Sequence, residues 1–145
     1  DRHLTLEQTK LSAYATYIDS IKNGVTTVFD HHASFGHIEG SLHMIEEASK
    51  DLGVRTCLCY EISDRDGMEK SRESVMENVN FIRHVREDDS DMLAAMMGMP
   101  CHDVPQCSIL NFLSTDTVAL ELSVDRFGRS ITSLKPSFIS DSIRI

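Results

Sequence analysis

Side chains able to do chemistry gather directly after two short apolar runs, residues 25–29 and 54–60. Imidazole and carboxylate groups are common acids, bases and metal ligands, and a guanidinium group binds carboxylates and other oxyanions. We therefore expect them to be binding groups that gather outside the carboxyl ends of two strands. The six candidates are His31, His32, Ser34, Glu61, Asp64 and Arg65.

The orientation of these groups leaves alternatives open. Neighbouring residues of a strand point to opposite faces, so His31 and His32 cannot both bind one metal ion unless the chain has already turned. One of them then faces the site and the other the helices, and either can equally be a hydrogen-bonded structural histidine. Residues 64–67 read as a turn that starts a helix; alternatively, Arg65 holds a carboxylate or orients Glu61 through a bidentate contact.

The remaining histidines and the cysteines favour structural roles. Cys57 and Cys59 are separated by one residue, which suits two buried, reduced thiols on one strand face better than a zinc site or a disulfide. We expect reduced thiols for all four cysteines, which also include Cys101 and Cys107. The three histidines expected to lie in or beside helices and to face solvent are His37, His43 and His84.

Alternating helices and strands position the two polar groups. The expected helices cover residues 5–23, 41–50 and 68–86, and the expected strands cover 25–29, 54–60 and 92–99. By propensity, the methionines and alanines of residues 92–99 would suit a helix equally well. Thr5 and Gln8 form a predicted capping box, and Gly24 and Gly53 end the first two helices. Ser41 is the expected cap of the second helix.

Apolar periodicity predicts which helix faces are buried. The residues expected on the inner faces are Leu11, Tyr14, Ile18 and Ile21 in the first helix, Leu42, Ile45, Ala48 and Leu52 in the second, and Val75, Val79, Ile82 and Val85 in the third.

This order of elements indicates an α/β fold with right-handed crossovers and a parallel sheet, whose strands we expect to be covered on both faces. Two architectures stay open: a doubly wound sheet, or consecutive βα units of a (β/α)₈ barrel. A whole barrel needs roughly 250 residues, so the second makes this chain a partial barrel. The apolar residues of the segment 100–145 follow neither the helical nor the strand period. We therefore expect an irregular tail with one or two short helices near residues 106–122.

The composition and net charge of the chain indicate which classes of partner to expect. The chain has 145 residues, 41% of them hydrophobic, and a formal net charge of -9, which repels phosphate backbones and anionic lipid. We therefore expect no nucleic-acid partner and no membrane partner. No apolar run approaches the ~20 residues of a spanning helix, and the N-terminus lacks a signal-peptide pattern, so we expect a cytoplasmic protein.

Two segments resemble a known enzyme family. Residues 23–34 read NGVTTVFDHHAS and residues 52–67 read LGVRTCLCYEISDRDG. Both are similar to the amidohydrolase superfamily, specifically to aminohydrolases of the SsnA type, close to the chlorohydrolase and cytosine or guanine deaminase branch. The resemblance covers about residues 1–99.

The resemblance implies the second to fourth strands of a distorted barrel that binds one or two divalent metal ions, zinc or iron. Family members use the metal to generate hydroxide, which attacks a carbon bearing an amino or chloro group on a small-molecule substrate. The family's His-x-His metal pair is absent here, because no two histidines are separated by one residue. We therefore assign no metal ligand, and the resemblance instead places the six candidates on the substrate side of the site or in support of it. We expect this chain alone to bind no divalent metal and to be inactive.

The resemblance stops at Met99. The family continues with His-Ala, whereas this chain continues Pro100-Cys101-His102. Removing one C after the Met99 codon gives codons that permit a family-like continuation, so residues 100–145 are either a frameshifted tail or a genuinely divergent one.

A rival interpretation is a non-catalytic, doubly wound binding module that presents His31 and Arg65 to an anion or a protein partner. A partial barrel leaves strand edges exposed and predicts self-association. A self-contained module predicts a monomer.

Overall fold

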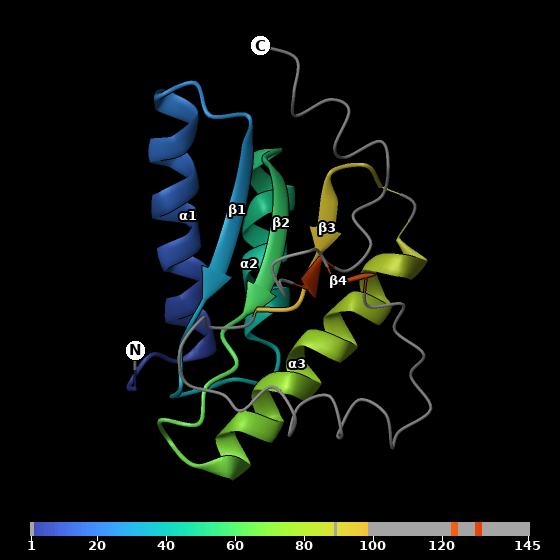
Figure 1. Cartoon of the computed structure of the whole chain (residues 1–145). Coiled ribbons are helices and arrows are strands. Elements are labelled where there is room, and N and C mark those ends of the chain that lie inside the picture. Colours follow the sequence, from blue (N-terminus) through green and yellow to red (C-terminus); the bar gives the residue numbers. More distant parts are fainter. Residues whose placement is uncertain (1, 89, 99–122, 125–129, 132–145) are drawn as a thin grey trace.

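The computed structural model describes residues 2–88, 90–98, 123–124 and 130–131. Helices and strands alternate along its main part (Figure 1). In chain order these elements are α1 (Leu6–Lys22), β1 (Thr27–His32), α2 (Ser41–Leu52), β2 (Arg55–Tyr60), α3 (Met68–Glu87) and β3 (Leu93–Ala95). The predicted order of helices and strands is confirmed, although β1 lies further along the chain than expected and β3 is shorter.

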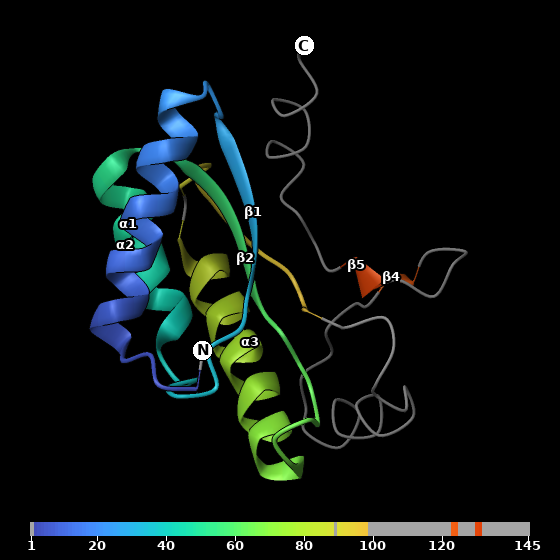
Figure 2. The ribbon, with the colours of Figure 1, turned by 90° about the vertical axis from the view of Figure 1, so that its left-hand side faces the viewer.

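The first three strands form one parallel sheet in the order β1-β2-β3. Phe29 pairs with Cys57, and Thr56 pairs with Leu93. All three helices cover the same face of this sheet, as Figure 2 shows. Consecutive barrel units are arranged in this way, whereas a doubly wound sheet carries helices on both faces. Three strands do not close a barrel, so the barrel stays a prediction.

The opposite face of the sheet is open at β1. The prediction that the strands are covered on both faces is wrong for this strand, because the Phe29 side chain is 53% exposed there. On β2 the same face is buried: Cys57 packs with Ala94 and Met96.

Helix α1 begins and ends as predicted but buries a different face. Thr5 and Gln8 form the capping box, and Gly24 follows the C-cap with a φ of 76°. The expected stripe is wrong for three of its four residues: Leu11, Ile18 and Ile21 are 59%, 40% and 46% exposed. The fourth, Tyr14, is partly buried and packs against the core. The buried residues are Thr9, Ala13 and Tyr17. The small side chains of Thr9 and Ala13 let α1 pack closely on the rest of the fold. The Tyr17 hydroxyl lies 3.0 Å from Thr56 Oγ1.

Helices α2 and α3 bury the predicted stripes, including Leu42 and Ile45 on α2 and Val79 on α3. Only Leu52 of the predicted residues on these two helices is partly buried.

The N-terminal cap of α2 differs from the prediction. Ser41 is the first helical residue and Gly40 is the N-cap, with no side-chain cap of its own. The orphan amides are satisfied from α3, where the Glu77 carboxylate accepts from Gly40 N at 2.9 Å and from Leu42 N at 3.0 Å. A carboxylate at a helix N-terminus also complements the helix dipole.

A buried amide fixes the C-terminal end of β2. Asn78 of α3 accepts from Tyr60 N and donates to Tyr60 O, both at 2.9 Å. It also donates to Ser74 O at 2.9 Å, and its side chain is fully buried. The Asn78 amide thus completes the hydrogen bonding of Tyr60 next to the point where β3 ends at Ala95.

Few of the described residues belong to the C-terminal third of the chain. Ser123–Val124 and Ser130–Ile131 pair as the short antiparallel strands β4 and β5. The predicted helices near 106–122 and the departure after Met99 lie outside the described residues. Among the helices that the structure describes, none is both long and apolar enough to span a bilayer.

Candidate functional site

The two adjacent histidines at the end of β1 face opposite sides of the sheet, as the strand period predicts. His31 is exposed on the open face, and its Nε2 lies 3.0 Å from the position that a Cβ on Gly98 would occupy. The same Cβ would lie 2.2 Å from Tyr60 O, so only glycine permits this close approach of the chain to the end of β2. His31 is therefore the histidine available to a site on the open face.

His32 points toward α1. Its ring meets that of Tyr60 edge-on, with centroids 5.6 Å apart. Within the described part of the chain, its Nε2 is buried without a hydrogen-bond partner. Burial lowers the pKa of His32 to about 4, so the ring is neutral at pH 7.

A cavity of about 290 Å³ separates α1 from β1, and His32 lies in its wall. Thr9 and Asp30 also line it. The pKa of Asp30 lies above its ordinary value, because the effect of burial outweighs the opposing effect of the nearby His31. This cavity lies on the helix side of the sheet, away from the face that carries His31.

Ser34 has a structural place in the loop after β1. It is fully buried, and its backbone N donates to the Tyr60 hydroxyl at 2.9 Å. Burial raises the pKa of Tyr60 to about 12, so the phenol stays protonated. This contact ties the loop after β1 to the end of β2.

Glu61 and Arg65 form an ion pair after β2. One terminal guanidinium nitrogen of Arg65 contacts Glu61 Oε1, and Arg65 Nε donates to Ser63 Oγ at 3.0 Å. The guanidinium carbon lies 5.6 Å from the centroid of the Phe35 ring. Arg65 therefore orients Glu61, as one of the two interpretations expects, although through one nitrogen instead of a bidentate contact.

The other interpretation, a helix-start turn, is also observed. Gly67 N donates to Asp64 O at 2.9 Å, and Gly67, with a φ of 93°, is the N-cap of α3. The neighbouring Asp66 carboxylate pairs with Arg2 at 2.7 Å. Asp64 thus lies in the turn that leads from the polar cluster into α3.

The cysteine prediction is confirmed where the structure describes it. Cys57 and Cys59 are buried free thiols on one strand face. Burial raises the pKa of each to about 12, which keeps both protonated. Cys101 and Cys107 lie outside the described residues.

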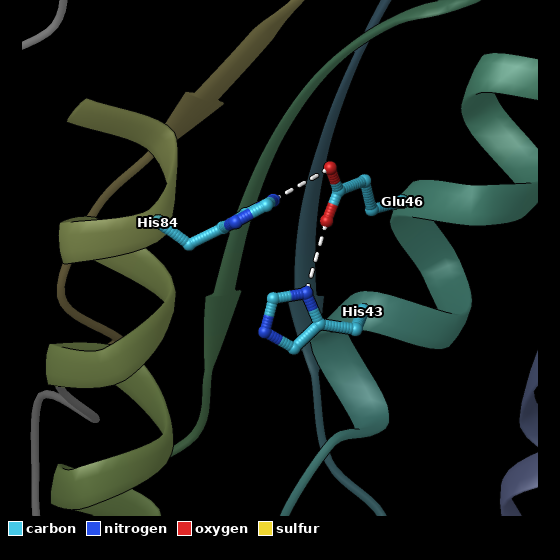
Figure 3. Close-up of side chains that lie close together, drawn as sticks. All are labelled: His43, Glu46 and His84. Atoms are coloured by element: carbon cyan, nitrogen blue, oxygen red, sulfur yellow. Dashed lines mark hydrogen bonds and ion pairs between the residues drawn. The ribbon is translucent and has the colours of Figure 1, made fainter. Parts of the chain in front are cut away.

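The strand ends do not form a metal site by themselves. Within the described ranges, the one group of three or more His, Cys, Asp or Glu side chains whose ligand atoms converge lies elsewhere, on α2 and α3. It contains His43, Glu46 and His84, and we call it the interhelix cluster (Figure 3). The described residues at the strand ends therefore do not fit the metal site of the resembled family.

The interhelix cluster corrects the expectation that His43 and His84 simply face solvent. Their side chains are 39% and 40% exposed, and both contact the buried Glu46 carboxylate. His43 Nδ1 lies 3.1 Å from Oε2, and His84 Nε2 lies 2.9 Å from Oε1. Burial raises the pKa of Glu46, but hydrogen bonds from Lys50, His84 and His43 outweigh it and leave the pKa below its ordinary value.

Sequence reasoning could have found only two of the three members of this cluster. The spacing of His43 and Glu46, three residues apart on one helix, predicts neighbouring side chains. Nothing in the sequence places His84 beside them, because that requires the packing of α3 on α2. His37, by contrast, is exposed as expected, with Nδ1 3.1 Å from Leu4 O.

The chain is similar to a curated deaminase. It is 29% identical over 106 residues, 73% of its length, to a protein of Thermococcus onnurineus named 5-methylthioadenosine/S-adenosylhomocysteine deaminase. The matched stretch spans 23% of that relative, so the chain corresponds to about a quarter of the longer protein. No family model matches the chain, and no solved structure matches it.

Proposed function

We propose that this chain supplies consecutive βα units of a metal-dependent aminohydrolase that removes an amino group from a small heterocyclic molecule. The observation that carries the proposal is the similarity to a deaminase over most of the chain, together with polar side chains at the ends of two parallel strands. In parallel α/β folds, binding sites lie at this edge of the sheet. The closer assignment to the SsnA-type branch is part of the proposal.

The reaction is the hydrolysis of a C–N bond. Water adds to the carbon that bears the amino group, the C–N bond breaks, and ammonia leaves with a proton from water. A divalent metal supplies the activated water in the resembled family, and its ligands lie outside the residues described here.

The residues of this chain contribute on the substrate side. His31 and Glu61 lie at the C-terminal ends of β1 and β2, where an imidazole and a carboxylate can hydrogen-bond a heterocycle. Arg65 orients the Glu61 carboxylate through their ion pair. Ser34 and His32 hold the loop and strand behind this edge, through the contacts of both with Tyr60.

Ammonia release tests this proposal. The zinc- or iron-loaded chain is incubated with 5′-methylthioadenosine and other amino-substituted heterocycles, in parallel with the protein encoded by this chain plus the coding sequence on either side. We expect no turnover by the chain alone and turnover by the longer protein. The substitution Glu61→Gln should reduce turnover at least 10-fold, whereas Glu69→Gln, at an exposed position on α3, should not.

Two results would count against it. If the longer protein released no ammonia from any amino-heterocycle, it would not be an aminohydrolase. If the isolated chain turned over with stoichiometric metal, its own residues would complete the site and the partial-barrel account would fail.

A further inference from the structure

The interhelix cluster lies apart from the strand ends and plays no part in the proposed hydrolysis. Two of its members come from one helix and the third from the next, and His84 lies 38 positions after Glu46 along the chain. We propose that His43, Glu46 and His84 bind one divalent ion of the zinc class. This inference does not rest on the proposed function.

The spacing of the donor atoms suits such an ion. In a tetrahedral site with zinc–nitrogen distances of about 2.0 to 2.1 Å, neighbouring ligand atoms lie about 3.3 Å apart. The two imidazole nitrogens lie 3.1 and 2.9 Å from the carboxylate oxygens. All ligand atoms lie within 4.8 Å of one another. An ion can therefore enter after small side-chain movements, with the helices held in place.

The donor types select the class of metal. Two imidazole nitrogens and one carboxylate suit zinc and its neighbours among the transition metals, whereas magnesium and calcium take oxygen ligands. The histidines are 39% and 40% exposed, which gives an ion a path from solvent and leaves room for a water molecule as fourth ligand. The carboxylate is only 6% exposed and so is held in place.

Neighbouring rings restrict where the imidazoles can point. The His43 ring packs edge-on against His84 and Phe81, with centroids 4.7 and 5.3 Å apart. Figure 3 shows both imidazoles directed at the carboxylate between them. A metal ion needs an unprotonated nitrogen on each ring, and a neutral imidazole provides one by carrying its proton on the other nitrogen.

Lys50 would compete with a metal ion for the Glu46 carboxylate. Its Nζ lies 2.7 Å from Glu46 Oε1, and also 3.1 Å from Asp88 Oδ2. The ammonium can therefore leave Glu46 for the metal and keep Asp88 as its partner. It follows that removing the Lys50 charge should strengthen metal binding, an effect that a merely structural ion pair would not produce.

Metal binding would join α2 to α3. Because the ion binds the folded arrangement of ligands, it should raise the midpoint of thermal unfolding. For a domain of this size, zinc at 100 times its Kd should raise Tm by about 8 °C.

Cobalt titration of the full chain tests the site, because tetrahedral Co²⁺ gives strong visible absorption. We expect one equivalent to bind, zinc to displace it, and Tm to rise with zinc. His43→Gln and His84→Gln should each weaken binding at least 10-fold, and Lys50→Met should strengthen it severalfold. His3→Gln removes an exposed histidine and should change nothing, as should the double substitution Cys101→Ser with Cys107→Ser.

Several outcomes would overturn the proposal. These are no binding at one equivalent, binding that persists in the His43→Gln and His84→Gln variants, binding that is lost with the cysteine substitutions, and an unchanged affinity in Lys50→Met. Circular dichroism of each variant shows that it is folded before its affinity is compared.

Discussion

Replacing Asn78 by leucine should destabilise the fold, because it removes three buried hydrogen bonds. Leucine has as many side-chain heavy atoms as asparagine and branches at the same carbon, but it removes the amide that bonds Tyr60 N, Tyr60 O and Ser74 O. The buried Tyr60 N–H would lose its acceptor, which costs about 1 to 3 kcal/mol of stability. Tyr60 O and Ser74 O would each lose a donor, which costs about 0.5 to 1 kcal/mol apiece. We expect a loss of about 2 to 5 kcal/mol in the free energy of unfolding.

Urea unfolding followed by circular dichroism measures this loss. Asn80→Leu is the matched control, because Asn80 is exposed on the same helix and its replacement should change stability by no more than about 0.5 kcal/mol. If Asn78→Leu were within 1 kcal/mol of Asn80→Leu, the amide would not hold the end of β2.

Three further predictions concern the sheet, two at the C-terminal ends of its strands and one at its lateral edges. Gly98→Ala should cost about 3 kcal/mol or more, measured by urea unfolding, because its Cβ would lie 2.2 Å from Tyr60 O. His32 has a folded pKa of about 4, below its unfolded value near 6.5, so its contribution to stability is complete above pH 6.5 and is lost as the pH falls toward 4. This loss is at most about 3 kcal/mol, and His32→Leu should flatten the unfolding free energy between these pH values, whereas His3→Leu should not. Light scattering should show self-association through the β1 and β3 edges of the sheet, whereas a monomer at all concentrations would favour the binding module.

Local signals in the sequence predicted the elements well. The capping box of Thr5 and Gln8 and the glycines after α1 and α2 act within a few residues, so sequence alone reveals them. The strand period likewise predicted that His31 and His32 face opposite sides. The polar groups after β1 and β2 could be placed at one edge because parallel strands share their C-terminal edge.

Long-range contacts explain what sequence reasoning missed. The buried face of α1 depends on how closely Ala13 and Thr9 approach their neighbours, which apolar periodicity does not encode. The cap of α2 comes from Glu77, 35 residues beyond Leu42, and the end of β2 is held by Asn78 from the same helix. Both are polar residues on the inner face of α3, and the periodicity of apolar residues does not predict buried polar ones. The convergence of His84 on Glu46 depends on the same helix packing.

The DNA on both sides of this coding sequence gives the most direct test of the partial-barrel account. The account predicts that the frame upstream of Asp1 encodes a strand with a His-x-His pair. In the resembled family, histidines on later strands and a closing aspartate complete the metal site. The account therefore also predicts that the frame downstream of Met99, read as it stands or shifted by one base, encodes these residues. Flanking DNA that encodes neither in any frame would contradict it, and would leave the chain as an α/β module with no aminohydrolase around it.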